Sequence, residues 1–215
     1  MATLIDMYEY AEAAVEGALA AGATYADARV VVSKQEGIDV QNQAVQSLDR
    51  SEQAGVGVRA LTGSSWGFFA TADLTRRAAT GAGERAAEIA RASAAVPGDP
   101  MQFADVDVVD ATYETPYVED PFTVPMSEKV DLLIGVTTTM QGVPGIALAR
   151  ASLGFFDTSK WFVSSQGHRI HQHLVESGGG FDATAVGEFE TQRRSYPQSF
   201  GQYETGGYEV IRRWD

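Results

Sequence analysis

The chain contains no cysteine, which excludes a disulfide framework, a thiolate metal site and a cysteine nucleophile. It has no apolar run of the roughly 20 residues that a membrane-spanning helix needs, and its first residues carry acids where a secretory signal would carry bases. Against 29 acidic residues it has only 16 Lys and Arg, and its formal net charge is −13. Because phosphate binding depends on Lys and Arg, we expect no binding to nucleic acid. The missing signal and membrane segments lead us to expect a cytoplasmic protein that does not bind a membrane.

Common catalytic motifs are absent as well. The sequence contains no G-x-S-x-G elbow, no G-x-x-x-x-G-K-[ST] phosphate loop and no H-E-x-x-H helix. Its three histidines, His168, His171 and His173, all fall in one run. If that run is a strand, His171 and His173 point to the same face and could hold a transition metal. We interpret them as the polar face of a half-exposed strand, with a metal site as the alternative.

The chain has 215 residues, which is long enough to bury a core without the support of a metal or of disulfides. Residues 1–95 are predicted to form a helix, a five-strand meander and a second helix. The helices are Thr3–Ala21, with Gly22 as its left-handed cap, and an alanine-rich stretch from Leu74 to Ala90 capped by Thr71 or Asp73. The strands are Asp27–Ser33, Gly37–Gln41, Val45–Glu52 and the two arms of Gly55–Thr71, with turns at Lys34–Glu36 and Asn42–Gln43.

Residues 96–125 are interpreted as an acidic, proline-rich connector. Asp105 and Asp107 alternate with valines, which predicts a short strand around Val106–Val109 with an acidic outer face. Clustered carboxylates can also bind calcium, but the spaced glycine of a calcium loop is missing. The pattern therefore favours the strand.

Residues 126–215 are predicted to form a helix over Ser127–Gln141 followed by a second antiparallel meander. Its strands are Ile146–Phe156, Trp161–Ser164, His168–Glu176, Phe181–Gly187 and Glu188–Ser195. The stretch from Tyr196 to Gly207 is expected to be loop. The predicted class is α+β, with antiparallel meander sheets packed with about three helices. One continuous N-terminal domain is the alternative to three segments.

The hairpin Gly55–Thr71 is the most apolar feature of the first segment, and it must be covered. Alternation sends Trp66 and Phe68 to one face and Phe69 to the other. We predict Phe69 in the core, and Trp66 or Phe68 on a surface that meets a partner. An alternative in which all three aromatic side chains lie in the core stays open.

Several short motifs follow one another along the chain. They are Ala26-Asp27-Ala28-Arg29, Gly55-Val56-Gly57-Val58-Arg59, Gly67-Phe68-Phe69-Ala70-Thr71, Ser164-Ser165-Gln166-Gly167, Arg193-Arg194 and Gly206-Gly207-Tyr208-Glu209. In this order they resemble the N-terminal half of the TldD/PmbA family, proteins first called modulators of DNA gyrase and now regarded as metallopeptidases. In the fourth motif, Ser164 and Gln166 stand where the family has an asparagine and an acid.

The resemblance implies a zinc peptidase whose metal is held by a His-Glu-x-x-x-His helix in its C-terminal half. That motif does not occur here, so we expect this chain to be an N-terminal, non-catalytic half that shapes the peptide cleft and the subunit interface. The resemblance also implies that zinc is bound in the missing half, that the substrate is a peptide or unfolded protein, and that the protein forms a homodimer or a heterodimer with a second TldD/PmbA-like subunit. Arg59, Trp66 and Phe68 are the expected substrate or interface residues. The alternative is a free-standing, truncated binding or regulatory module without enzymatic activity.

Overall fold

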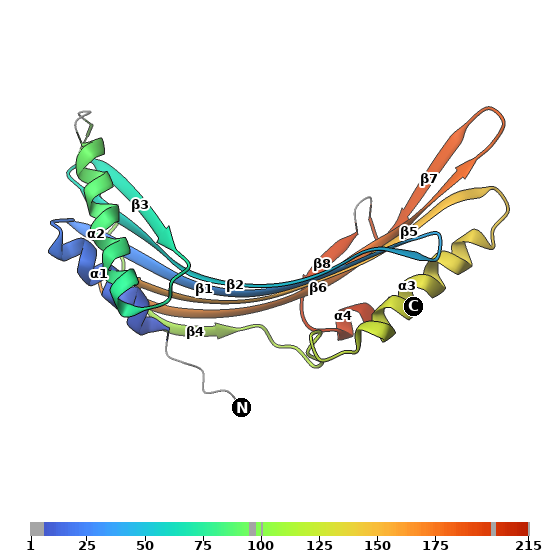
Figure 1. Ribbon diagram of the computed structural model, residues 1–215, viewed down its shortest axis with the longest axis horizontal. Helices are drawn as coiled ribbons and strands as arrows, with labels where there is room; N and C mark the ends of the chain where they lie inside the picture. The colour runs from blue at the N-terminus through green and yellow to red at the C-terminus, as the bar shows by residue number, and fades with distance from the viewer. Residues whose placement is uncertain (1–6, 95–97, 100, 199–200, 215) are drawn as a thin grey trace. The chain divides into compact units, whose positions relative to one another are not determined.

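The computed structural model describes residues 7–94, 98–99, 101–198 and 201–214, and Figure 1 shows the order of the elements. The helices are α1 (Tyr8–Ala20), α2 (Arg76–Ser93), α3 (Met126–Gln141) and α4 (Glu209–Arg212). The strands are β1 (Tyr25–Gln41), β2 (Ala44–Thr62), β3 (Ser65–Thr71), β4 (Asp110–Glu114), β5 (Ile146–Ser164), β6 (Arg169–Val186), β7 (Thr191–Tyr196) and β8 (Gln202–Thr205). Helices packed with a largely antiparallel sheet confirm the predicted α+β class.

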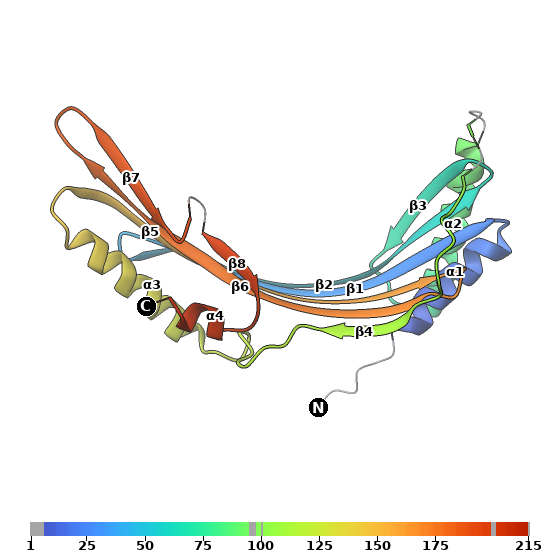
Figure 2. The ribbon, with the colours of Figure 1, turned by 180° about the vertical axis from the view of Figure 1, so that it is seen from behind.

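The strands of the described residues belong to one sheet rather than to two meanders. Its order is β3-β2-β1-β5-β6-β4, and β7 and β8 also pair with β6. Because β1 and β5 are neighbours, they join the two predicted meanders. Strand β4 pairs with β6 in parallel, as Figure 2 shows, whereas β7 and β8 pair with it antiparallel.

The chain forms two compact units, and neither is a single stretch of sequence. The first contains the chain up to Ser33, Gln53–Glu114 and Thr158–His173. The second contains Lys34–Glu52, Thr115–Asp157 and Leu174–Asp215. The predicted segments 1–95, 96–125 and 126–215 do not coincide with these units, because β1, β2, β5 and β6 each have residues in both.

Residues 25–71 form three strands, so the predicted five-strand meander is wrong. The expected turn at Lys34–Glu36 lies inside β1, and the expected break near Glu52 lies inside β2. Even-numbered positions of β1 are buried from Ala26 to Val30 and again from Glu36 to Val40. The period of two therefore continues through the polar residues, and no turn is required there. The turn at Asn42–Gln43 is confirmed, with φ of 49° and 67° at the two residues.

The second meander also has fewer and longer strands than predicted. The expected turns at Asp157–Lys160 and Gly178–Gly180 lie inside β5 and β6. The glycines of β6 mark close contacts instead of a turn, because a Cβ at Gly178 would lie 2.2 Å from the carbonyl oxygen of Gln202. Strand β8 occupies part of the stretch that was predicted to be loop.

The core of the first unit lies between the sheet and the helices α1 and α2, which lie side by side in Figure 1. The two helices pack through small residues, since a Cβ at Gly83 would lie 1.9 Å from the carbonyl oxygen of Ala14. Neither predicted cap of α2 is right: the Thr75 hydroxyl accepts a hydrogen bond from the Ala78 N–H at 3.2 Å. Gly22 has the predicted left-handed φ, at 93°, whereas Thr3 lies outside the described residues.

The core of the second unit lies between the sheet and the helices α3 and α4. Helix α3 begins one residue before its predicted start and ends where predicted. Its Lys129 is fully buried: the ammonium group forms an ion pair with buried Glu36, donates to the carbonyl oxygen of Pro121 at 2.5 Å and lies 4.4 Å from the centre of the Phe155 ring. This buried pair, which the sequence pattern did not indicate, attaches α3 to the sheet.

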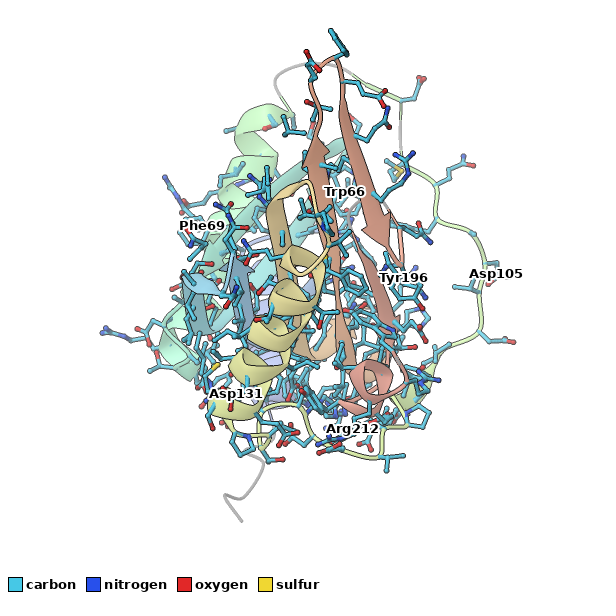
Figure 3. The ribbon with its side chains drawn as sticks, turned by 90° about the vertical axis from the view of Figure 1, so that its right-hand side faces the viewer. Trp66, Phe69, Asp105, Asp131, Tyr196 and Arg212 are labelled. Carbon is cyan, nitrogen blue, oxygen red and sulfur yellow. The ribbon has the colours of Figure 1, made fainter. Side chains whose placement is uncertain are left out.

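The connector contains no strand at Val106–Val109, so that prediction is wrong. Asp105 lies on an irregular, exposed stretch (Figure 3), and strand β4 begins only at Asp110. The valines expected to pack inward are exposed. Alternation of Asp and Val favours a strand only where the valines can pack against neighbouring strands or a core. The exposed valines of this stretch do not pack in this way.

Candidate functional site

The face of the first unit that α1 and α2 leave uncovered carries a groove over β1, β2 and β3. Its volume is about 420 Å³, and its lining residues are Arg29, Val31, Ser33, Gln53, Ala54, Gly55, Val56, Gly57, Arg59, Phe68, Ala70 and Thr71. The strands place these residues by alternation: odd positions of β1 and β2 face the groove, while Ala28, Val58 and Ala60 face the helices. The groove thus combines two guanidinium groups with an apolar wall.

Asp27 organises the two arginines from beneath. Its side chain is fully buried, at 0% exposed. Arg59 donates from Nη2 to Oδ2 at 2.7 Å and from Nε at 3.1 Å, Arg29 donates to Oδ1 at 2.5 Å, and the Tyr25 hydroxyl donates to Oδ2 at 3.2 Å. One carboxylate therefore holds two guanidinium groups, which leaves the cluster with a net positive charge. The Asp27 hydrogen bonds and charge raise the pKa of Arg59.

Aromatic rings flank this cluster on the same face of the sheet. The Arg59 guanidinium lies 5.2 Å from the centre of the Trp66 ring, and that of Arg29 lies 4.8 Å from the centre of the Phe162 ring. Tyr25 meets Trp66 edge-on at 5.7 Å. Burial, followed by the negative charge of Asp27, raises the pKa of Tyr25 to about 12. The tyrosine is therefore a hydrogen-bond donor at neutral pH.

Arg59, Trp66 and Phe68, predicted from sequence as substrate or interface residues, lie on one face of the sheet. Phe68 stands opposite Arg59 in the β2–β3 register and is 60% exposed, whereas Trp66 is half-buried. The alternative with all three aromatic side chains in the core is therefore wrong. The placement of Phe69 in the core is also wrong, because its side chain is 37% exposed and belongs to neither core cluster. Alternation assigned its face, but α2 does not cover that part of β3.

The histidines lie elsewhere in the first unit. The His171 ring stacks on Trp161, with 4.7 Å between ring centres, and its buried Nε2 has no hydrogen-bond partner. Burial lowers the pKa of His171; the charge of nearby Glu114 partly opposes this effect, and the electrostatic interaction with His173 adds to it. His168 accepts a hydrogen bond at Nδ1 from the Val109 N–H at 3.1 Å. Among the described residues, no three His, Asp or Glu side chains gather as a metal site would require.

The turn Ser164-Ser165-Gln166-Gly167 supports the candidate site from its end. Ser165 donates its N–H to the carbonyl oxygen of Ala26 at 2.8 Å and accepts from the Ala26 N–H at its hydroxyl, at 3.1 Å. Gly167 has φ of 95°, which allows the tight turn. The turn thus holds the residue that precedes Asp27, which is a structural role.

The sequence patterns placed Asp27 only in a strand and a motif, and they did not predict that Asp27 lies at the centre of the site. A signal was available: Asp27 and Arg29 alternate on one strand, and an acid at an inward position of an otherwise apolar strand needs a basic partner. That Arg59 is that partner depends on the neighbouring positions of β1 and β2 in the sheet.

Comparisons with known proteins point to one family. Residues 26–94 match the family model described as PmbA/TldA metallopeptidase domain 1. A protein of Methanothermobacter thermautotrophicus described as a metalloprotease is 26% identical over 191 residues, which cover 89% of this chain and 40% of that protein. The chain therefore spans less than half the length of this relative. These matches confirm the resemblance to the TldD/PmbA family that the motifs predicted.

Solved structures share the fold. A putative modulator of DNA gyrase from Bacteroides thetaiotaomicron superposes with a TM-score of 0.72 at 15% identity, covering 95% of this chain and 46% of that one. A second, from Thermotoga maritima, gives 0.65 at 15% identity and covers 92% and 42%. TldE from Thermococcus kodakarensis gives 0.59 at 12% identity and covers 88% and 43%. In the described residues, no helix is both long and apolar enough to span a membrane.

Proposed function

We propose, from the match of residues 26–94 to domain 1 of the PmbA/TldA metallopeptidases, that this chain is the non-catalytic N-terminal half of a zinc metallopeptidase. The observation that carries the proposal is this match, together with relatives more than twice as long as the chain. Zinc and the glutamate that activates water are assigned to the other half. Two histidines alone bind a metal weakly, and His171 is occupied by its stack on Trp161.

The role assigned to the first unit in proteolysis is to present an extended peptide. Strand β3 is the last strand in the order of the sheet, and its only described pairing is with β2. An unpaired edge offers its backbone N–H and C=O groups to another extended chain. No proline blocks this edge. A substrate strand added there would be held by its backbone, so that many sequences would be accepted.

The role assigned to the groove is contact with a second subunit. An exposed Phe68 in a groove that also contains two arginines is a composition typical of interface centres, where aromatic residues and Arg are enriched. The partner is a second TldD/PmbA-like subunit, identical or paralogous. The assembly is placed in the cytoplasm, in keeping with the cysteine-free sequence.

The proposal is tested by assaying the chain alone for zinc content and for cleavage of an unfolded fluorogenic peptide, and then with a C-terminal half supplied in trans. We expect neither zinc nor cleavage from the chain alone, and both when the halves are combined. Zinc-dependent cleavage by these 215 residues alone would contradict the proposal.

The edge of β3 is tested by hydrogen exchange. An extended peptide should slow exchange of amides in residues 65–71, whereas the same peptide with N-methylated backbone, which cannot donate to a strand, should not. Equal protection by both peptides, or protection elsewhere only, would refute pairing at this edge.

A further inference from the structure

The end of the β6–β7 hairpin, residues 182–196, is an arm whose outer part, from Val186 onward, has no covering layer. Its strands pair from Asp182 with Ser195 to Val186 with Thr191. From Val186 to Tyr196 every residue is exposed, and Figures 1 and 3 show both strands extending past the end of α3. Strand β6 is also supported on its other side as far as Val186, whose N–H donates to the Gly145 carbonyl oxygen at 3.1 Å. The arm therefore presents an exposed tip on a base that is held in the sheet, as a contact element for a partner would be.

The tip of the arm presents an apolar side chain between two acids. Phe189 is 92% exposed, the highest value among the exposed large hydrophobic side chains of the described residues. Glu188 and Glu190 flank it, and Glu190 accepts a hydrogen bond from Gln192 at 3.1 Å. The turn is closed by the Gly187 N–H, which donates to the Glu190 carbonyl oxygen at 2.8 Å. The structure thus holds an anchor of the sequence Glu-Phe-Glu in a defined turn.

The groove of the first unit has the complementary chemistry. Among the residues that the structure describes, no acid lines it, although the chain as a whole carries a net charge of −13. Arg29 and Arg59 share only Asp27, and their side chains remain 38% and 47% exposed. Arg59 uses Nε and Nη2 on Asp27, and Arg29 uses Nη1. The remaining guanidinium nitrogens can therefore donate to carboxylates of a partner.

The wall and floor of the groove suit an aromatic side chain. Phe68 forms the wall, and its ring lies over Gly57, where a Cβ would meet it at 3.4 Å. Ala70 and Val31 complete an apolar lining. Aromatic rings favour offset or edge-on contacts with one another, and a phenyl ring inserted beside Phe68 would bring its flanking acids towards the two arginines.

We propose that the occupant of the groove is the arm tip Glu188-Phe189-Glu190 of a second copy of this chain. Opposite charges and the exposed anchor in one chain support a self-complementary contact, which a two-fold dimer would make twice. The inference rests on the interface part of the proposed function and assigns that interface its residues. It is independent of where peptide binds and of the zinc.

The contact is tested by disulfide crosslinking, because a chain without cysteine gives each introduced thiol a unique identity. One variant carries Thr191→Cys, beside the arm tip, and the other carries Ala70→Cys, in the groove. When the two variants are mixed and oxidised, the crosslinked dimer that joins one to the other should form at about ten times or more the yield of a control pair. The control pair is Thr191→Cys with Val118→Cys, because Val118 is 88% exposed but lies outside the groove.

Two further variants separate the anchor from the fold. Phe189→Ala in the arm variant should lower the crosslinking yield about tenfold, as the loss of an interface anchor does. Circular dichroism should remain unchanged, because the side chain has no packing to lose. Phe68→Ala in the groove variant should have the same effect. Raising the salt concentration should also lower the yield, because the flanking ion pairs are screened.

The inference is overturned if the arm and groove thiols crosslink no better than the control pair, or if Phe189→Ala leaves the yield unchanged. It is also overturned if a synthetic Glu-Phe-Glu peptide binds the groove while two copies of the chain do not crosslink, since the occupant would then be another protein. None of these results depends on peptidase activity, so failure of the crosslink and failure of the proposed function are distinguishable.

Discussion

Replacing Asp27 with asparagine is the sharpest test of the cluster beneath the groove. The substitution keeps the shape of the side chain but replaces one acceptor oxygen with an NH2 group. That group would face guanidinium donors on one side, since Arg29 and Arg59 together approach both carboxylate oxygens. At least one charge-assisted hydrogen bond is lost, and the two arginines are left without their shared counter-charge.

The size of the effect follows from burial. A hydrogen bond to a charged group contributes about 1.5–3 kcal/mol, and removing one partner of a fully buried pair costs about 3–5 kcal/mol. Asp27 is fully buried, but Arg29 and Arg59 are 38% and 47% exposed, so water can hydrate the charges that remain. We therefore expect Asp27→Asn to lower the free energy of unfolding by about 3 kcal/mol, below the upper limit for a buried pair.

The assay is urea denaturation followed by circular dichroism, with the midpoint compared at constant m-value. Asp73→Asn is the matched control, because Asp73 is exposed in the same unit and its side chain accepts no described hydrogen bond; it should change stability by less than about 0.5 kcal/mol. If Asp27→Asn behaves like this control, the two arginines do not depend on Asp27 and the proposed organisation of the groove is incorrect.

Three further predictions concern packing and titration. Gly83→Ala should destabilise the first unit by about 2 kcal/mol or more, as overpacking does, because its Cβ would meet the backbone of α1. Gly81→Ala, in the same helix, has open space and should stabilise the unit by about 0.5–1 kcal/mol. Shifts of the two urea midpoints in the same direction would contradict this contrast. Burial lowers the pKa of His171, so the stability that this side chain contributes is present above a pH of about 6.5 and is lost as the pH falls through its folded pKa. His171→Phe, which keeps a ring on Trp161, should flatten the dependence of stability on pH between pH 7 and 5 in urea titrations. An unchanged slope would refute this prediction. The pKa of Tyr25 is raised from 10 to about 12, so stability should fall as the pH rises through that window, and Tyr25→Phe should lessen the loss; a variant that loses stability as steeply as the wild type would show that Tyr25 does not carry the effect.

Local sequence signals identified what depends on near neighbours. The period of about 3.6 residues predicted the helix at Ser127–Gln141 to within one residue, because the apolar face of a helix is written in its own sequence. The positive φ values at Asn42 and Gln43 agree with a turn predicted from residue type. Alternation likewise sent Trp66 and Phe68 to the same face.

The lengths of the strands and the burial of their faces were decided by the tertiary structure. Turn-forming residues at Lys34–Glu36 indicated a break, but pairing with neighbouring strands keeps β1 extended across them. Phe69 points to the face that carries α1 and α2, yet it is exposed because the cover depends on where α2 lies. The sequence of one strand does not show which strands will pair with it or which helix will cover its face, since both depend on residues far away in the sequence.

The motifs carried the family resemblance, and the sequence by itself therefore determined what this chain resembles and that it lacks a His-Glu-x-x-x-His helix. Only the tertiary structure showed that Asp27 joins Arg29 to Arg59, which is 32 residues away in the chain from Asp27. It likewise brought Lys129 to Glu36 across 93 residues. A buried charge must be compensated locally in space, but the sequence does not state which distant residue will be its neighbour, because that depends on how the strands pair and the helices pack.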